Sequence, residues 1–306
     1  MRKLFIILAL IVLAVVPIIG QNTSSTFTAA DTYIHMNVTN AIGTQLTNAI
    51  MTTGTSGTFS AWTSSPTPPT GMLLATNHCP PPLRNITVNR KGEFPRLFPS
   101  QSISLDNTKN NTYEEFDLNA GVQQLTVQGC IILGPPNQGV SSSLFDFVEI
   151  TGSITGDEVI LQLDNGEGLA NGRYEIYFET LPNGVTTEIA LCTVSQFQAI
   201  YYVMSADYSK NPGNATLVIY DARTGAYLGG LYNQAVHGGA EVAEDIGNVR
   251  FGNNEAGSVA GTTYFEQTAI TYGIVGSTGA GTLPLKPIWK SAGAATPVRR
   301  RASVVQ

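Results

Sequence analysis

The chain has 306 residues, of which 42% are hydrophobic and only 12% are charged. The apolar share is enough for a full core, whereas so few charges argue against a coiled coil, a charged disordered chain and a basic nucleic-acid binder. The formal net charge of −6 averages three unlike regions. Residues 1–20 carry +2, residues 276–306 carry +5, and residues 21–275 hold 9 basic and 22 acidic side chains, a net −13.

The first twenty residues have the pattern of a secretory signal peptide. Arg2 and Lys3 precede an apolar run over residues 4–19, and polar residues begin at Gln21. A positive start followed by an apolar stretch and a small residue, here Gly20, is typical of an export leader. We expect the leader to be removed and the protein to be secreted. The alternative is a retained N-terminal anchor, since the run is barely long enough to span a bilayer, and we expect membrane contact only through it.

Residues 21–120 are expected to contribute the first strands and loops of a sandwich that extends to residue 275. Alternating apolar residues favour a strand within 27–39, and a short helical turn is expected within 44–62. Prolines at 66, 68 and 69, and again at 80–82, mark loops, because proline removes a backbone donor and fixes φ. The basic residues 276–306 are rich in Gly, Ser and Ala, so they predict a flexible tail.

From residue 121 onward, short segments rich in Val, Ile, Tyr, Phe and Thr alternate with turn residues. The predicted strands cover residues 122–133, 143–151, 158–164, 173–180, 185–194, 199–207, 215–221, 226–232, 248–252 and 262–272. Asn183-Gly184 is one of several turn sequences that tolerate positive φ at a chain reversal. Closely spaced strands with no helical period between them indicate antiparallel sheets packed as a sandwich.

Three cysteines, Cys79, Cys130 and Cys192, are too few for a disulfide framework or a paired zinc site. One disulfide with a leftover thiol and three free cysteines are both compatible with the sequence. The ligand and the oligomeric state also stay open at this stage.

Four groups of strands occur in a recognisable order. They comprise residues 144–150 with 159–166, residues 174–178, residues 199–203 with 215–221, and residues 249–254 with 263–270. Over about residues 125–274 this order resembles the concanavalin A-like lectin/glucanase superfamily, in particular its laminin-G-like secreted members. The resemblance implies an all-β fold, an antiparallel two-sheet jelly-roll sandwich. It also implies a non-catalytic module for carbohydrate or cell-surface binding, or for adhesion.

The glucanases of that superfamily carry a Glu-x-Asp-x-x-Glu pattern on one strand. This chain places Asp146 and Glu149 at the second and third positions, but the nucleophile position holds Leu144. Retaining glycosidases need two carboxyl groups about 5 Å apart, so the departure argues against catalysis. The alternative is a diverged glycoside hydrolase in which Asp146 and Glu149 act with an acid from elsewhere. A third hypothesis for the function is a structural protein of an extracellular assembly.

A calcium site is the one metal hypothesis that the sequence supports. Nine acids lie between residues 146 and 188, against the single basic residue Arg173. Ca²⁺ takes six to eight oxygen ligands, and the turn with Asp164, Asn165 and Glu167 offers three side-chain donors. The simpler alternative is a solvated acidic turn that binds no metal.

Tyrosines on the later strands are the candidate glycan contacts. The residues we select are Tyr201, Tyr202, Tyr227 and Tyr232. Aromatic rings stack on sugars when they are exposed, but strand alternation turns about half of such residues toward the core. A glycan or cell-surface polymer is therefore the expected partner, and nucleic acid is not expected.

Overall fold

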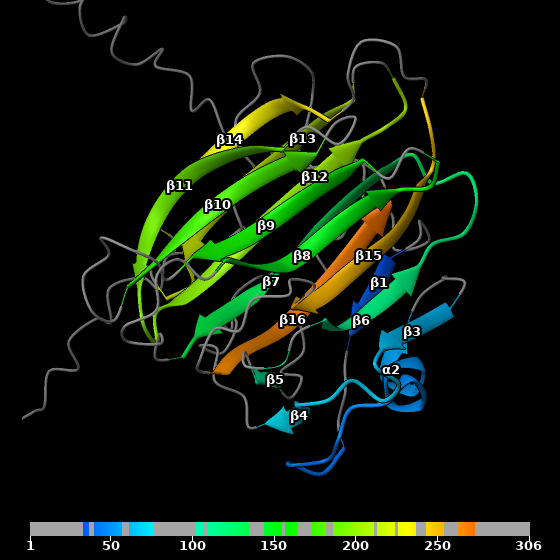
Figure 1. The fold of residues 1–306 in the computed structure, drawn as a ribbon, viewed down its shortest axis with the longest axis vertical. Coiled ribbons are helices and arrows are strands. Elements are labelled where there is room, and N and C mark those ends of the chain that lie inside the picture. The colour runs from blue at the N-terminus through cyan, green and yellow to red at the C-terminus, as the bar shows by residue number, and fades with distance from the viewer. Residues whose placement is uncertain are drawn as a thin grey trace, which may run out of the picture.

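The computed structural model describes residues 33–36, 40–56, 61–75, 102–106, 109, 111–134, 144–154, 157–164, 173–181, 186–210, 213–223, 226–236, 243–253 and 262–272. Within these residues the protein is all-β apart from one short helix, α2 (Asn48–Gly54). The strands form two antiparallel sheets stacked face to face (Figure 1). The predicted all-β, two-sheet architecture is therefore confirmed. The predicted leader 1–20 and tail 276–306 lie outside the described residues.

One sheet has seven strands, all antiparallel to their neighbours. Its order is β11 (Thr187–Ser195), β10 (Arg173–Leu181), β9 (Glu158–Asp164), β8 (Leu144–Gly152), β15 (Ile246–Asn253), β6 (Thr112–Asp117) and β3 (Ala61–Ser65). The hairpins β8–β9–β10–β11 follow the chain, whereas β15 inserts between β8 and β6 from far along the sequence.

The other sheet has nine strands. Its main path is β14 (Tyr227–Ala235), β13 (Asn214–Asp221), β12 (Ala199–Asp207), β7 (Gln124–Leu133), β16 (Thr262–Tyr272), β1 (Tyr33–Met36) and β2 (Thr55–Ser56). The first half of β16 also pairs with β5 (Ser102–Asp106), which in turn pairs with β4 (Met72–Ala75).

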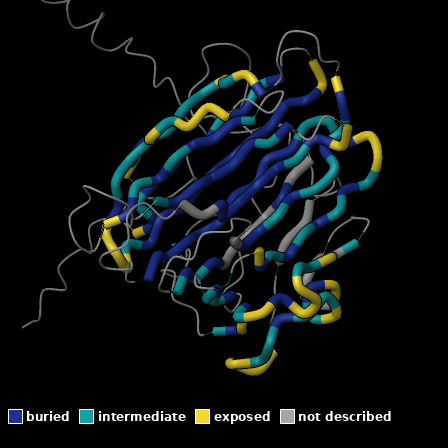
Figure 2. Tube along the Cα trace, viewed as in Figure 1, coloured by how far each residue is buried: buried dark blue, intermediate teal, exposed yellow. Residues whose placement is uncertain are grey.

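The core lies between the two sheets. Alternate residues of each strand point inward, as the period of two requires, and they include Phe147, Leu161 and Phe178 from the seven-stranded sheet. Ile200, Tyr202 and other residues of the nine-stranded sheet close over them. Figure 2 shows buried residues along the central strands and exposed residues at the edges and turns. The central strand β12 is buried at every position.

The ten strands predicted from residue 122 onward are all present, with ends shifted by at most three residues. The short helix α2 confirms the expected helical turn within residues 44–62. Strands β3 to β6 were not predicted, because their segments are short and flanked by prolines or charges. No helix in the described part of the chain is long and apolar enough to cross a membrane.

The edge strands β11 and β14 bring the two sheets together along one side of the sandwich. Gly229 of β14 lies against the backbone of β11, where an added Cβ would collide with the Leu191 carbonyl oxygen. A glycine is needed here because no side chain fits between the two strands. Cys192 of β11 is a half-buried free thiol, whereas Cys130 of β7 is disulfide-bonded. Cys79, the remaining cysteine, lies outside the described residues.

Glu114 is a fully buried carboxyl group on the core side of β6. It lies directly across from Phe251 of β15 and Ser64 of β3. Neither of its carboxyl oxygens has a hydrogen-bond partner in the described part of the chain. Burial raises the pKa of Glu114 from 4.5 to about 8, so the folded protein holds this group protonated at neutral pH.

We expect Glu114→Gln to remove a pH dependence from the folding stability. The folded pKa of about 8 exceeds the unfolded value of 4.5, so the folded state binds the proton more tightly. The stabilisation is full below the unfolded pKa and is lost as pH rises through about 8. In urea unfolding, the wild type should lose on the order of a few kcal/mol over this range relative to the variant. Identical pH profiles for the two proteins would contradict the assignment, and the exposed Glu188→Gln is the control.

Candidate functional site

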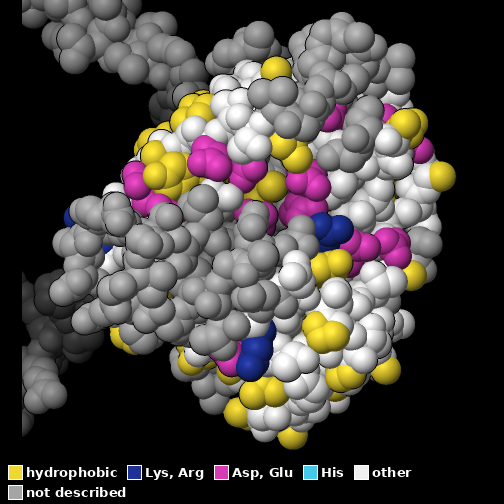
Figure 3. All heavy atoms as spheres, viewed as in Figure 1, with side chains coloured by type: hydrophobic (Ala, Val, Ile, Leu, Met, Phe, Trp, Pro, Cys, Tyr) yellow, Lys and Arg dark blue, Asp and Glu magenta, His cyan; other side chains and the backbone are white. Residues whose placement is uncertain are grey.

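Most of the acids in the middle of the chain lie on one side of the seven-stranded sheet, the side turned away from the core. Residues directly opposite each other in antiparallel strands share a face, and the register therefore defines this surface. We call it the acidic face. Its charged residues are Glu115, Asp117, Asp146, Glu149, Glu158, Asp164, Arg173, Glu175, Glu179, Glu188 and Arg250. Figure 3 shows Asp and Glu side chains gathered on this side of the molecule beside a basic group.

A β-bulge places Asp146 and Glu149 on the same face. Residues three apart on a regular strand point to opposite sides of the sheet. The register of β8 against β9 shifts between Asp146 and Val148, which inserts one extra residue and turns Glu149 to the side of Asp146. Both side chains are buried, with exposures of 5% and 1%. The local sequence thus keeps two of the three positions of the resembled motif on one surface.

Gln162 of β9 connects two carboxylates at the centre of the acidic face. Its side-chain nitrogen Nε2 donates to Asp146 Oδ1 at 3.0 Å and to Glu179 Oε2 at 2.7 Å. All three side chains are buried. The orientation of the amide follows from these bonds, because the flipped amide would set its oxygen against two carboxylates. The amide oxygen Oε1 has no hydrogen-bond partner in the described residues.

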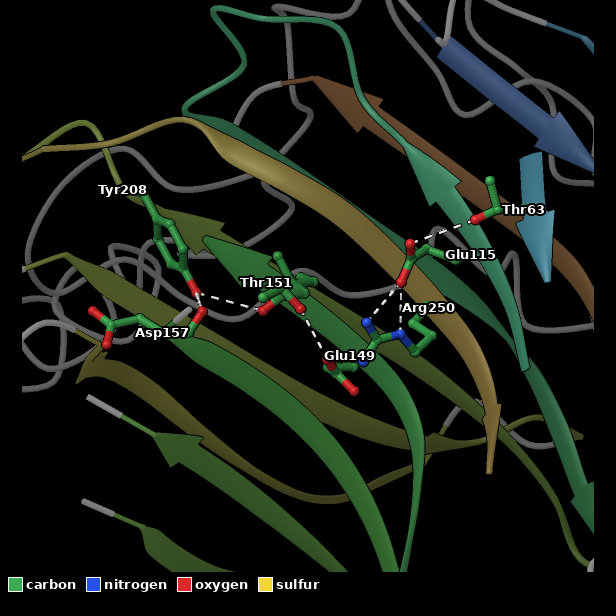
Figure 4. Close-up of polar contacts among 8 residues, drawn as sticks. Thr63, Glu115, Glu149, Thr151, Asp157, Tyr208 and Arg250 are labelled. Carbon is green, nitrogen blue, oxygen red and sulfur yellow. Dashed lines mark hydrogen bonds and ion pairs between the residues drawn. The ribbon is translucent and has the colours of Figure 1, made fainter. Parts of the chain in front are cut away.

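Arg250 of β15 joins the acids of the neighbouring strands β8 and β6 (Figure 4). Its Nη1 lies 2.6 Å from Glu149 Oε1, and its Nη2 lies 2.6 Å from Glu115 Oε2. Its Nε also donates to Glu115 Oε2, at 2.8 Å. Thr151 donates to Glu149 Oε1 at 2.8 Å, and the guanidinium lies 4.6 Å from the centre of the Tyr113 ring. The cation is thereby held on several sides.

Burial and charge shape the protonation of this cluster. Burial alone would lower the pKa of Arg250, but Glu149 and Glu115 outweigh it and raise that pKa. Glu158 of β9 lies beside Glu149. The pKa of Glu158 is raised to about 7, mainly by burial and next by the Glu149 carboxylate. Arg250 acts in the opposite direction. Glu158 is therefore partly protonated near neutral pH, unlike an ordinary glutamate.

A partly exposed aromatic ring borders the buried centre. Tyr177 of β10 lies directly across from Gln162, and its hydroxyl donates to Glu175 Oε2 at 3.0 Å. Glu175 is in turn directly across from Asp164 of β9. All of Tyr177, Glu175 and Asp164 are partly exposed. A ring and two carboxylates, all partly exposed, thus lie side by side on the acidic face.

The four tyrosines chosen from the sequence do not gather at one site. Tyr202 points into the core and is fully buried. Tyr201 lies on the side of the nine-stranded sheet that faces away from the core between the sheets. It is nevertheless only 6% exposed, and its hydroxyl donates to Gln128 Oε1 at 2.7 Å. The choice of Tyr201 and Tyr202 as exposed contacts was therefore wrong, because β12 is covered on both sides. Tyr227 and Tyr232 lie on the edge strand β14, where Tyr227 is 50% exposed.

The calcium prediction is only partly covered by the structure. Asp164 ends β9 on the acidic face, whereas Asn165 and Glu167 lie outside the described residues. Among the described side chains, no group of three or more His, Cys, Asp or Glu is arranged to hold a metal ion. The calcium site stays a prediction.

Sequence reasoning missed the partners that organise the acidic face. These residues are Glu115, Gln162, Tyr177 and Arg250. One signal was available, since Arg250 is one of the few basic residues among the strands and stands in the middle of a strand. An arginine so placed must find an acidic partner on a neighbouring strand. The bulge that aligns Asp146 with Glu149 has no comparable signal.

No protein-family model matches the chain, and no curated protein matches it. Several solved structures are similar. The enzymatically active domain of tailspike protein 2 from bacteriophage CBA120 is 14% identical, with a TM-score of 0.42, over 70% of this chain and 29% of that one. The binding domain of botulinum neurotoxin serotype D is 10% identical, with a TM-score of 0.35, over 57% of this chain and 40% of that one.

A botulinum neurotoxin type C structure, whose cell entry is described as dependent on two ganglioside molecules, is 7% identical with a TM-score of 0.36. The match covers 58% of this chain and 41% of that one. In each case the chain spans less than half the length of the similar protein. Similarities this low assign neither a family nor a function.

Removing the charge of Arg250 should destabilise the fold strongly. Arg250→Gln leaves Glu149, which is 1% exposed, without its cation, and breaking a buried pair from one side costs about 3–5 kcal/mol. The double variant Arg250→Gln, Glu149→Gln should recover much of this loss, because no buried charge is then left alone. Denaturant unfolding measures both values.

The matched control is Lys210→Gln, which breaks the ion pair between Lys210 and Asp207. The side chain of Lys210 is 55% exposed. It should change the unfolding free energy by no more than about 1 kcal/mol. Equal effects of Arg250→Gln and Lys210→Gln would show that Arg250 does not organise the acidic face.

Proposed function

We propose that this chain is an exported, non-catalytic carbohydrate-binding sandwich that contacts its glycan through the acidic face. The observation that carries the proposal is the group Tyr177, Glu175 and Asp164, in which a ring lies hydrogen-bonded beside one carboxylate with a second directly across. Sugars present apolar C–H faces that stack on aromatic rings, and hydroxyl donors that carboxylate oxygens accept.

The buried centre supports this role by fixing the surface. Gln162 holds Asp146 and Glu179 in place, and Arg250 does the same for Glu149. Side chains locked by hydrogen bonds lose little conformational freedom when a ligand arrives, so less of the interaction energy is lost on ordering. The leader predicted from the sequence supports an extracellular encounter with the glycan.

The test is a glycan-array screen of the full chain, run once with Ca²⁺ and once with a chelator. We expect binding in at least one condition and a loss of about tenfold in affinity for Tyr177→Ala, the value of a stacked ring. Tyr227→Ala is the matched control, since it removes an exposed tyrosine from the edge of the other sheet.

No bound glycan in either condition would contradict the proposed function. Weakening by Tyr227→Ala but not by Tyr177→Ala would contradict the proposed site. The thermal midpoints of both variants are recorded beforehand, so that misfolding is not taken for lost binding.

A diverged glycoside hydrolase is a second candidate, and one observation favours it. Asp164 lies directly across from Leu144, the position at which the resembled glucanases carry their nucleophile. Any β-glucan turnover by the wild type should then be abolished by Asp164→Asn. Glycan binding without turnover by the wild type would remove this candidate.

A further inference from the structure

A second apolar cluster lies on the side of the nine-stranded sheet that faces away from the core. We call it the outer cluster. It comprises Cys130 and Ile132 of β7, Ala199, Tyr201 and Val203 of β12, and Val218, Tyr220 and Ala222 of β13 and the turn after it. Each of these side chains is at most 9% exposed. The outward side of an antiparallel sheet stays in contact with water unless another part of the protein covers it. The outer cluster is therefore covered.

Neither the other sheet nor helix α2 supplies this cover. The seven-stranded sheet packs on the opposite side, across the core (Figure 1), and α2 packs against β2 and β3. Among the described hydrophobic residues, Tyr232 of β14 and Tyr264 of β16 pack against the outer cluster, and both belong to the same sheet as the cluster. This leaves the parts of the chain outside the described ranges to supply the cover.

Cys130, a member of the outer cluster, identifies which part of the chain this is. Cys130 is disulfide-bonded, whereas Cys192 is a free thiol. The chain has three cysteines, so a bond within the chain leaves Cys79 as the other half. Cys79 belongs to residues 76–101, the connection between β4 and β5. The disulfide thus ties this connection to the outward side of the sheet.

The strand register places the start of the connection on the correct side of the sheet. One row of core residues runs across β4, β5, β16 and β7 through Leu74, Ile103, Phe265 and Ile131. The next row along begins at Ala75, the last residue of β4, and reaches Cys130 on β7. Because successive residues of a strand point to opposite faces, this second row points outward. Ala75 and Cys130 therefore share the outward face.

The distance between these two residues matches the length of chain available. Ala75 lies three strand spacings from Cys130, which is about 14 Å at about 4.8 Å for each spacing. The four residues from Ala75 to Cys79 span up to about 13 Å when extended. A disulfide bridges a further 5.5–6 Å or so between its Cα atoms, roughly enough to close the remaining distance with chain to spare.

The composition of residues 76–101 suits packing on an apolar surface. Prolines occupy positions 80–82, 95 and 99, and they carry no backbone N–H that would be left unpaired against a layer of side chains. The other apolar residues are Leu83, Ile86, Val88, Phe94, Leu97 and Phe98. Residues 80–101 span roughly 70 Å when extended, so they are long enough to cross the outer cluster and return to β5.

We propose that residues 76–101 pack on the outer cluster and are held there by a disulfide between Cys79 and Cys130. To form the bond, the two thiols pass two electrons and two protons to a disulfide-bonded oxidant, which becomes a dithiol. The predicted leader directs the chain to a compartment where such bonds form and persist. The proposal does not depend on glycan binding. It adds that the protein itself occupies the outward side of the nine-stranded sheet.

A peptide map of the full chain, secreted from cells and kept unreduced, tests the disulfide. The protein is alkylated under denaturing conditions and digested, and mass spectrometry identifies the linked peptides. We expect Cys79 linked to Cys130, and Cys192 alkylated. Alkylation of all three cysteines, a bond that includes Cys192, or a bond between two copies of the chain would overturn the proposal.

Hydroxyl-radical footprinting tests the packing. A Gly-Ser linker of equal length in place of residues 83–98 keeps both cysteines and should expose Tyr201. We expect its oxidation rate to rise by up to about eightfold, the ratio of the exposed fractions of Tyr227 (50%) and Tyr201 (6%). The matched control places the same linker over residues 281–296 and should leave Tyr201 protected. Tyr174, a core residue with no exposure, should stay unreactive in both variants.

Two outcomes would overturn the packing. One is protection of Tyr201 that survives replacement of residues 83–98, and the other is protection that is lost on replacement of residues 281–296. Oxidation of Tyr174 would show that a variant has lost its fold. In that case Tyr264→benzoylphenylalanine, beside the outer cluster, decides the question in an otherwise unchanged chain. It should photo-cross-link to residues 80–101, and a cross-link to any other segment outside the described ranges would overturn the proposal.

Discussion

The ion pairs of Arg250 hold together the side of the seven-stranded sheet on which the candidate site lies. The guanidinium bridges Glu149 of β8 and Glu115 of β6, two strands that β15 separates in the sheet. Three strands from distant parts of the sequence are thereby joined on their outward side, as apolar packing joins them on the inward side. Without this cation, Glu149 would be a buried charge and the acids around it would repel one another.

The two faces of this sheet differ in composition: the inward face is apolar and the outward face carries the acids. The inward face is the ordinary core of a sandwich, from which the protonated Glu114 departs. The outward face keeps buried carboxylates in fixed positions through Gln162 and Arg250. These fixed groups give the partly exposed Tyr177 and Glu175 beside them a rigid base, as a preorganised binding surface requires.

The sequence predicted the architecture well and the site only in outline. Period-two patterns and glycine turns locate the ten later strands, because each is long and apolar on at least one face. Strand β6 was not predicted. Its buried positions are Thr112, Glu114 and Phe116, and they alternate with partly exposed positions that include Tyr113, so neither face is clearly apolar. Only the pairing of β6 with β15 shows which side of the strand is buried.

The concentration of acids between residues 146 and 188 pointed to the strands that carry most of the acidic face. Their convergence depends on the bulge in β8 and on cross-strand register, neither of which the local sequence encodes clearly. The tyrosines illustrate the opposite error. Tyr201 lies on the outer side of its strand, as a contact residue should, yet it is buried, because burial depends on what covers the sheet.

The most direct test is backbone amide chemical-shift mapping of the full chain during titration with an oligosaccharide that binds on the glycan array. We expect the largest shifts on β9 and β10 around Gln162, Glu175 and Tyr177, and no shifts on the edge strand β14. Shifts confined to β14 around Tyr227 and Tyr232 would contradict the claim that the acidic face is the binding surface.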